Sequence, residues 1–428
     1  MKNTMLGVVA GLWLLAMPAA HAQGLAKVEK PEDVGLSGER LERISKRMRQ
    51  GVEKGELPGA VVLVARHGHV AYLKAFGLRD PEAKAAMATD AIFRIASMTK
   101  PITSLAIMML AEEGALSIAD PAEKYLPEFK DLKVGTVRQV DGKSEVALEP
   151  QRRPMTVQDL LRHTSGLTYG AAGDNPLKQA YVDAKASDRG QTNAEMVTKL
   201  SKLALVFQPG TTWEYSMSTD VLGRIVEVAS GMPLDRFVAE RILKPLKMND
   251  TGYSVPAEKA GRGARPHREG AKNEVPAVPL VTQDFAWKSG GGGMVSTASD
   301  YARFCQFWLN GGQLDGVRLV SRKTIELMSS DHLPPGTKMG PDMARFEALT
   351  PSREMGQGFG LGFAVRNEAG MSPLHGSPGD IFWGGAFGTY FWIDPAEGMF
   401  AILMMQSPHA RLPYRYLMRE LVYQAIVD

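Results

Sequence analysis

Strand patterns occur near both ends of this chain, and helical patterns fill most of the sequence between them. Residues Gly59–Gly77 form two β-rich runs around His67–Gly68, which predicts a hairpin. Aliphatic and aromatic runs return near the C-terminus, at Leu361–Val365, Phe387–Trp392 and Met399–Met405. We therefore expect one sheet built from both ends of the chain, with a mainly helical insertion between them.

The expected domains follow from this arrangement. Residues 23–115 and 287–428 should form an α/β domain, and residues 116–286 should form a mainly helical domain. Apolar residues at helical spacing predict an amphipathic helix over Ser37–Lys54, and the last helix is expected at Pro413–Ile426. A chain of 428 residues is long enough for two or three such units.

Three stretches inside the insertion have different patterns. Val134–Arg153 is polar and is expected to be an irregular surface segment. Met155–Leu167 begins with Thr156 and Asp159, which predicts a capping box, and this helix is expected to end at Gly166. Helical spacing continues further along, at Asn193–Leu205 and Val221–Pro245.

The N-terminus has the pattern of a secretory signal peptide. Lys2 is followed by the apolar run Met5–Met17, and Ala20-His-Ala22 resembles a cleavage site. The apolar run is shorter than the roughly 20 residues that span a bilayer, although a retained anchor is the alternative. We predict that residues 1–22 are removed after Ala22, that the mature protein is periplasmic or secreted, and that it has no stable membrane association.

Composition excludes several other classes of protein. Lys and Arg number 50 against 47 Asp and Glu, and no long basic run occurs, so nucleic acid is not an expected partner. The single cysteine, Cys305, forms no intramolecular disulfide and is expected in the core. His67 and His69 lack a third ligand, so no metal site is expected there. Ser289–Gly293 lacks the lysine and spacing of a phosphate-binding loop, and no cofactor is predicted.

Ser97 and Lys100 stand three residues apart, directly before Pro101. Proline is tolerated in the first turn of a helix and costs about 3 kcal/mol in its interior. Because Ile102–Glu113 is strongly helical, the helix must begin just before Pro101, which places Ser97 at its positive end. At this spacing Lys100 can fold back to the Ser97 hydroxyl, and then activate it as a nucleophile.

The alternative interpretation is a serine that caps a helix, followed by a solvated lysine. The hydrophobic helix that follows makes a solvated lysine harder to explain. A nucleophile also needs a proton acceptor and an oxyanion hole. Tyr215 offers the first, and Gly384–Gly385, expected to open a strand, would let backbone approach a substrate closely.

Together, the motifs resemble those of the penicillin-recognising serine hydrolases, which include class C β-lactamases, DD-peptidases and family VIII carboxylesterases. They occur in the order typical of that superfamily: Ser97-Met-Thr-Lys100, "LLRHTSGL" (Leu160–Leu167), "FQPGTTWEYSM" (Phe207–Met217), "GGGMVSTASDYARF" (Gly291–Phe304) and Trp383-Gly384-Gly385. The resemblance implies a β-lactamase-like fold, with an α/β domain around an antiparallel sheet and an all-α domain, and a site between them.

The same resemblance implies roles for individual residues. Ser97 would be the acylated nucleophile, Lys100 its activating partner and Tyr215 the general base. The backbone N–H groups of Ser97 and Ala386 would form the oxyanion hole. His163 belongs to a family motif as well, and we interpret it as structural because no glycine elbow accompanies it.

Two departures from the β-lactamase pattern bear on the substrate. Class C β-lactamases usually have Tyr-x-Asn, where this chain has Met217, and a Lys-[Ser/Thr]-Gly motif, where it has Trp383-Gly384-Gly385. Met217 lacks the amide and Trp383 lacks the cation that would bind a β-lactam. We therefore expect the substrate to be a neutral, short-chain acyl ester, as in the family VIII carboxylesterases. The residues expected to bind it are Met217, Trp383, Gly384 and Gly385.

The predicted activity is ester hydrolysis through an acyl-enzyme. The alternatives are a β-lactamase or D-alanyl-D-alanine peptidase, and a non-catalytic penicillin-binding-like protein. A free tyrosine has a pKa of about 10, and Lys100 is the main cation in the sequence motifs that could favour the ionised form of a tyrosine base. An alkaline activity optimum is therefore expected.

Overall fold

The structure is a computed structural model that describes residues 25–141, 143–173 and 175–428. The predicted signal peptide and its cleavage site lie outside these residues. Within them, eight strands form one sheet in the order β12-β13-β14-β15-β16-β1-β2-β3, with every neighbouring pair antiparallel. The strands of this sheet are β1 (Gly59–Arg66), β2 (His69–Asp80), β3 (Ala85–Ala86), β12 (Gln357–Phe359), β13 (Ala364–Arg366), β14 (Ile381–Gly384), β15 (Tyr390–Asp394) and β16 (Met399–Met405).

The two ends of the chain meet in the middle of this sheet. β1 pairs with β16 from Ala60 opposite Met405 to Arg66 opposite Met399. Every residue of both strands is buried, as expected for apolar strands covered on both faces. The prediction of an antiparallel sheet built from both ends and flanked by helices is confirmed, whereas the exact domain boundaries remain a prediction.

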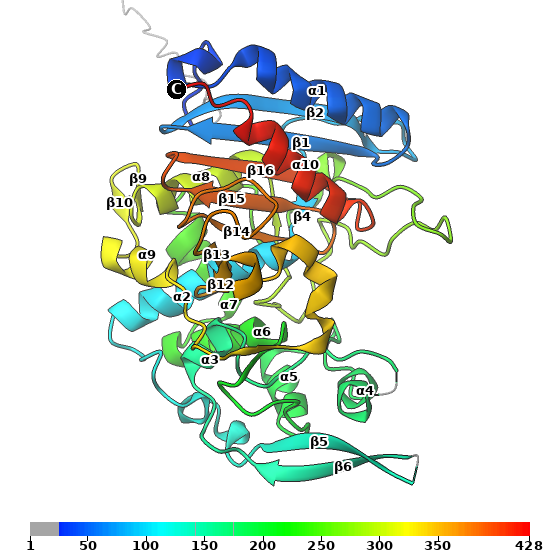
Figure 1. Cartoon of the computed structure of the whole chain (residues 1–428), viewed down its shortest axis with the longest axis vertical. Helices are drawn as coiled ribbons and strands as arrows, with labels where there is room; N and C mark the ends of the chain where they lie inside the picture. Colours follow the sequence, from blue (N-terminus) through cyan, green and yellow to red (C-terminus); the bar gives the residue numbers. More distant parts are fainter. Residues whose placement is uncertain (1–24, 142, 174) are drawn as a thin grey trace, which may run out of the picture.

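Helices cover both faces of the sheet. In Figure 1, α1 (Gly38–Glu53) and α10 (Arg411–Tyr423) lie together on one face, and α8 (Ala298–Leu309) lies on the other. Cys305 on α8 is fully buried, as predicted. The remaining α-helices are α2 (Lys100–Glu112), α3 (Val157–Leu161), α4 (Pro176–Asp183), α5 (Asn193–Leu200), α6 (Ser218–Ser230), α7 (Leu234–Val238) and α9 (Arg322–Met328).

Short strand pairs stand outside the main sheet. β4 pairs with β8, β7 with β11, β9 with β10, and β5 with β6. Their bounds are β4 (Phe93–Arg94), β5 (Lys133–Val140), β6 (Lys143–Pro150), β7 (Thr212–Trp213), β8 (Val295–Ser296), β9 (Gln313–Leu314), β10 (Val317–Arg318) and β11 (Lys338–Met339). Figure 1 shows the β5–β6 hairpin projecting at the end of the molecule far from α1.

Three local predictions were wrong. Val134–Arg153 is largely the β5–β6 hairpin, whose mostly exposed side chains hid the strand pattern. The helix expected to reach Gly166 ends at Leu161, because His163 has a left-handed φ of 58°. Gly384–Gly385 does not open a strand: Gly384 is the last residue of β14.

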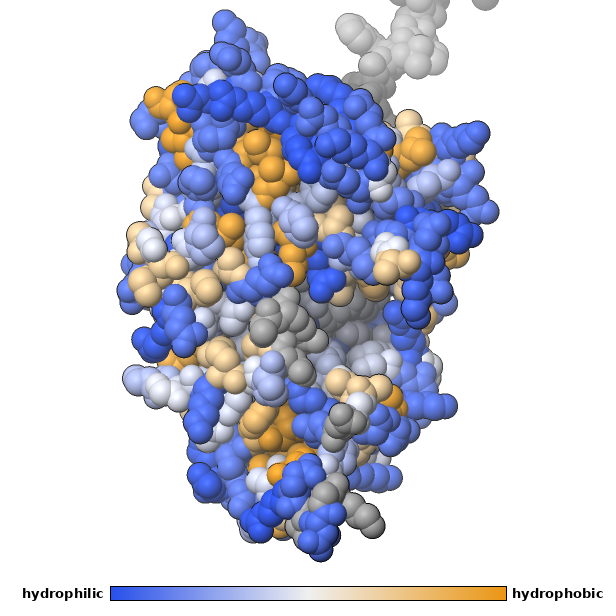
Figure 2. Space-filling model, turned by 45° about the vertical axis from the view of Figure 1, so that its right-hand side comes forward, coloured by the Kyte–Doolittle hydropathy of each residue, from blue (hydrophilic) through white to orange (hydrophobic). Residues whose placement is uncertain are grey.

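The face of the molecule seen in Figure 2 is mostly polar. Figure 2 shows hydrophilic residues over most of the visible face, with apolar residues in small separate groups. Among the described residues, no helix combines the length and apolar character needed to cross a bilayer.

Asp159 supplies a test of how the helical region is stabilised. Its buried carboxylate closes the predicted capping box with Thr156 and pairs with Arg153 at 2.5 Å and Arg162 at 2.9 Å. Burial alone would raise the pKa of Asp159, but the hydrogen bonds from Arg153 and Thr156 lower it to about 2. Since the unfolded value is about 3.9, this carboxylate contributes stability above that pH, and the contribution is lost as the pH falls through about 2.

We expect Asp159→Asn to lower the free energy of unfolding at neutral pH by about 3 kcal/mol, because it leaves two arginines without their partner. The variant should also lose less stability than the wild type between about pH 4 and about pH 2. Urea unfolding at several pH values measures both effects. Glu128→Gln, an exposed carboxylate in the same region, is the matched control. Equal stability of Asp159→Asn and wild type at neutral pH would contradict this role.

Candidate active site

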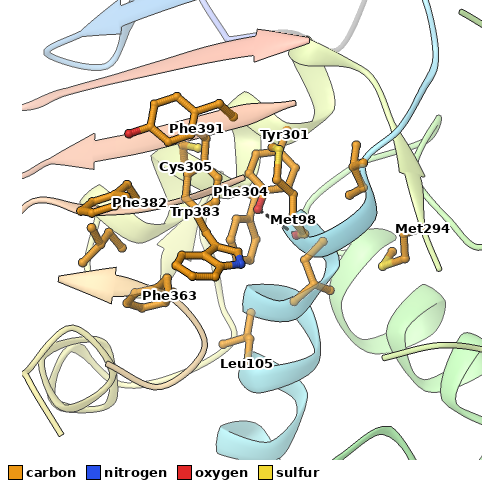
Figure 3. Close-up of a cluster of buried hydrophobic side chains, with 14 of the residues drawn as sticks. Met98, Leu105, Met294, Tyr301, Phe304, Cys305, Phe363, Phe382, Trp383 and Phe391 are labelled. Atoms are coloured by element: carbon orange, nitrogen blue, oxygen red, sulfur yellow. Dashed lines mark hydrogen bonds between the residues drawn. The ribbon is translucent and has the colours of Figure 1, made fainter. Parts of the chain in front are cut away.

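The predicted nucleophile lies where a short 3₁₀ turn runs into a buried helix. The turn covers Ala96–Thr99, and α2 begins at Lys100 with Pro101 in its first turn, as predicted. The Tyr301 hydroxyl donates a hydrogen bond of 3.0 Å to the Met98 carbonyl. Figure 3 shows both residues in the buried cluster between the sheet and α2 that also contains Trp383. The helix start is therefore anchored to the core.

Ala96, directly before Ser97, has a left-handed φ of 43°. This conformation is unfavourable for a residue with a Cβ, at a cost of about 1–3 kcal/mol, and such residues cluster at functional sites. Ala96 and Ser97 both line a cavity with a volume of about 480 Å³. The backbone turn thus places the Ser97 hydroxyl at the cavity wall.

Lys100 is fully buried beside Ser97. Its Nζ donates to the Gly291 carbonyl at 2.7 Å, to the Tyr169 hydroxyl at 2.9 Å and to Ser97 Oγ at 3.4 Å. These three acceptors use the full donor capacity of an ammonium group. The cation is therefore held in place with one N–H directed at the serine oxygen, where it can stabilise an alkoxide.

Asp220 on α6 supports the turn that receives Lys100. Its buried carboxylate accepts hydrogen bonds from Ser289 Oγ at 2.5 Å and from the Gly291 N–H at 3.0 Å. Burial raises the pKa of Asp220, and the nearby charge of Lys100 acts in the opposite direction. Asp220 and Lys100 thus both hold the Ser289–Gly291 turn by hydrogen bonds, Asp220 through Ser289 Oγ and the Gly291 N–H and Lys100 through the Gly291 carbonyl.

Tyr215 lies in an aromatic cluster beside Lys100. The ammonium is 4.5 Å from the centroid of the Tyr215 ring, and Trp383 Nε1 donates to the Tyr215 hydroxyl at 3.1 Å. A hydrogen bond of this kind is stronger to a phenolate than to a phenol. Trp383 is therefore a polar partner of the predicted base.

His163 packs against the Tyr215 ring, with 4.9 Å between the ring centroids. Its Nδ1 accepts a hydrogen bond from the Ser216 N–H at 3.3 Å. Burial, together with the charge of Lys100, lowers the pKa of His163 well below its ordinary value, which keeps the imidazole neutral. These contacts fit a structural part for His163, which holds the segment that carries Tyr215.

The β14–β15 turn brings backbone close to Ser97. A Cβ at Gly385 would collide with the Ile95 carbonyl, so this position requires glycine. A Cβ at Gly384 would displace the Arg415 guanidinium. Among the hydrogen bonds of the described residues, none uses the N–H of Ala386. Ala386 lines the cavity together with Ser97, so both predicted oxyanion donors border one space.

The cavity has an aromatic and basic lining. Aromatic side chains line much of it: Tyr169, Tyr215, Phe285, Trp287, Phe346 and Phe387. Four arginines also border it, and no described carboxylate does: Arg94, Arg189, Arg411 and Arg415. Such a lining can accommodate an apolar acyl group and also attracts negative charge. No cluster of three metal-ligating side chains occurs among the described residues.

The predicted site residues fall into two groups. Ser97, Tyr215, Gly384, Gly385 and Ala386 line the cavity, and Lys100 lies directly behind its wall. Met217 and Trp383 are buried and lie outside the lining of this cavity, so their contact with substrate remains a prediction.

Sequence reasoning missed two residues, Tyr169 and Arg415. Tyr169 follows the "LLRHTSGL" motif by two positions and bonds Lys100 directly, so the motif itself was a usable signal. Arg415 reaches the site from α10, the last helix, and nothing in its local sequence marks it.

Comparisons with known proteins identify the family of the chain. The beta-lactamase family model matches residues 44–423. The chain is 36% identical to an uncharacterized protein of Mycobacterium tuberculosis, over 84% of this chain and 88% of that one. It is 31% identical to the esterase EstB of Burkholderia gladioli, over 87% and 93% of the two chains.

Among solved structures, the chain is similar to EstCE1, described as a hydrolase with promiscuous acyltransferase activity. The TM-score is 0.72 at 25% identity, with 90% of this chain and 99% of that chain covered. The family match covers most of the sequence, and the fold, the ordered motifs and the relatives agree with it. The chain therefore belongs to the beta-lactamase family and is a hydrolase of the β-lactamase fold, within the group that includes family VIII carboxylesterases.

Proposed function

We propose that this chain is a serine esterase that cleaves short-chain carboxylic esters through an acyl-enzyme. The observation that carries the proposal is the buried ammonium of Lys100, which donates to Ser97 Oγ at the wall of an aromatic-lined cavity. A buried cation directed at a serine oxygen favours the alkoxide needed for attack. Similarity to an esterase over most of the chain supports the same class.

The proposed reaction has two halves. Ser97 Oγ attacks the ester carbonyl carbon and its proton passes to Tyr215, while the N–H groups of Ser97 and Ala386 bind the oxyanion. Tyr215 then returns the proton to the departing alkoxide, which leaves as the alcohol and gives the acyl-enzyme. Water attacks the acyl-enzyme in the same way, and the carboxylic acid is released. In this proposal the acyl group lies in the cavity beside Ser97, which Phe346 and Phe387 help to line, and the size of this cavity limits the acyl length.

The arginines around the cavity favour a second candidate, hydrolysis of a carboxylate-bearing β-lactam or D-alanyl-D-alanine peptide. Turnover of p-nitrophenyl butyrate, nitrocefin and a D-Ala-D-Ala peptide by the purified mature chain separates the two. We expect the ester to have the highest kcat/KM. Faster turnover of nitrocefin or the peptide would favour the second candidate, and no turnover or covalent labelling of any kind would favour a non-catalytic binding protein.

The pH dependence of ester turnover tests the tyrosine base. A general base accepts a proton only in its deprotonated form, so the fraction of enzyme with a competent base grows as the pH rises. We expect kcat/KM for p-nitrophenyl butyrate to increase from about pH 6 to about pH 9. Stopped assays corrected for spontaneous hydrolysis measure the profile. A maximum below neutrality would argue against Tyr215 as the base.

The predicted export signal is also a proposal. Lys2 and the apolar run that follows it support a periplasmic or secreted enzyme that is cleaved after Ala22. N-terminal sequencing of the protein recovered from cells should then begin at Gln23. An intact Met1 on active, cell-derived protein would contradict export with cleavage.

A further inference from the structure

Arg415 extends from α10 to the turn that follows β14. The side chain is 5% exposed, and its Nη2 donates to the Gly385 carbonyl at 2.6 Å and to the Thr389 carbonyl at 3.1 Å. The Gly388 N–H donates to the same Gly385 oxygen at 3.1 Å. The guanidinium therefore clamps both ends of the β14–β15 turn.

No carboxylate neutralises this guanidinium among the described residues. Arg419, one turn further along α10, is also buried, but it pairs with Asp380 at 2.6 Å. Arg415 has only carbonyl acceptors and the face of the Tyr390 ring, 5.6 Å from the guanidinium carbon. Burial lowers the pKa of Arg415 to about 10, so it still carries its charge at neutral pH. An uncompensated cation in a desolvated position acts strongly on its neighbours.

The Gly385 carbonyl and the Ala386 N–H belong to the same peptide group. In a trans peptide these two bonds point in opposite directions. When Arg415 holds the oxygen on the α10 side, the N–H must therefore point away from α10. A charged donor on the oxygen also withdraws electron density from the peptide, which makes the N–H a stronger donor. This N–H has no acceptor among the hydrogen bonds of the described residues, and Ala386 borders the cavity together with Ser97.

We propose that Arg415 is the positioning residue of the oxyanion hole, which orients and polarises the Gly385–Ala386 peptide from behind. The inference rests on the proposed serine esterase function. The charge is proposed to act on the oxyanion through the Gly385–Ala386 peptide. Arg415 lies on α10, far along the chain from the motifs of the site. In the motif that precedes Ala386, this chain has Trp383 where β-lactamases have a lysine.

The proposal predicts a selective loss in kcat. Removal of an oxyanion donor typically costs about 10²–10³ in kcat. Arg415→Met keeps the Ala386 N–H but removes the charge that orients and polarises it. We therefore expect kcat for p-nitrophenyl butyrate to fall by about 10- to 100-fold, with KM changed by less than about threefold. Arg415→Gln, which keeps an N–H without the charge, should resemble Arg415→Met. Arg415→Lys should recover part of the loss.

Activity is expressed per active site, counted by end-point labelling of Ser97 with a fluorophosphonate, so that unfolded protein does not contribute. Binding of a boronic acid, which forms a tetrahedral adduct with the serine, should weaken by about the same factor as kcat/KM. Arg419→Lys is the control: it perturbs a buried arginine of the same helix and should lower stability while kcat per labelled site stays near that of the wild type.

Two results would overturn the role of Arg415 alone: an unchanged kcat per labelled site in Arg415→Met, or a rise in KM at constant kcat. If Arg415→Met does not fold, equal kcat values for Arg415→Gln, Arg415→Lys and wild type would have the same meaning. A wild-type chain that neither hydrolyses the ester nor accepts the label would overturn the proposed function and this inference together.

Discussion

Ser97→Ala should lower kcat/KM for p-nitrophenyl butyrate by about 10⁴-fold or more. The substitution removes the oxygen of the proposed nucleophile, while the proposed oxyanion donors and the cavity remain. Ser97 lines the cavity, and its oxygen lies 3.4 Å from the Lys100 ammonium, so loss of Oγ deprives that cation of one of its three acceptors. Steady-state assays and intact-protein mass spectrometry after fluorophosphonate treatment measure the loss of turnover and of the covalent adduct.

Ser187→Ala is the matched control for this experiment. Ser187 is an exposed serine that lines the same cavity, and it has no hydrogen bond to Lys100 among the described residues. This variant should still accept one label per chain. Residual ester turnover in Ser97→Ala of more than about one per cent of the wild-type value, or a label that moves to another residue, would contradict Ser97 as the nucleophile.

The parts of the fold that could be predicted are those with strong local patterns. Pro101 fixed the start of α2 because its missing N–H is tolerated only in a first turn. The continuous apolar run of β16 indicated a strand, and the structure places this strand in the middle of the sheet, covered on both faces. The β5–β6 hairpin has neither a marker residue such as Pro101 nor a continuous apolar run. Its side chains are largely exposed, and polar residues occur on both of its faces.

The site was predictable only where a motif marks the residue. Ser97, Lys100 and Tyr215 stand in recognisable motifs, and the structure brings them together at one cavity. The strained φ of Ala96 leaves no trace in the sequence, because alanine is an ordinary choice for a helix start. Arg415 is one of many arginines on amphipathic helices, and only the packing of α10 against the β14–β15 turn distinguishes it.

Two tyrosines, Tyr169 and Tyr215, lie beside Lys100, and both bear on the choice of base. Tyr169 accepts a hydrogen bond from Nζ at 2.9 Å, whereas Tyr215 presents its ring to Nζ and receives the Trp383 N–H at its hydroxyl. A charged donor favours a phenolate more than a neutral donor does, so the contacts alone do not rank the two tyrosines. The motif that carries Tyr215 assigns the base to it, and Tyr169 is then proposed to hold the ammonium in place.

We therefore expect Tyr215→Phe to lower kcat/KM for the ester by about 10³-fold, within the range for loss of a general base. Tyr169→Phe, the matched substitution, should cost about tenfold, because Lys100 retains the Gly291 carbonyl and Ser97 Oγ as acceptors. The alkaline rise in kcat/KM should persist in Tyr169→Phe and disappear in Tyr215→Phe, since only the base must ionise. The opposite ranking, with the alkaline rise lost in Tyr169→Phe, would assign the base to Tyr169 and leave Tyr215 as the residue that positions Lys100.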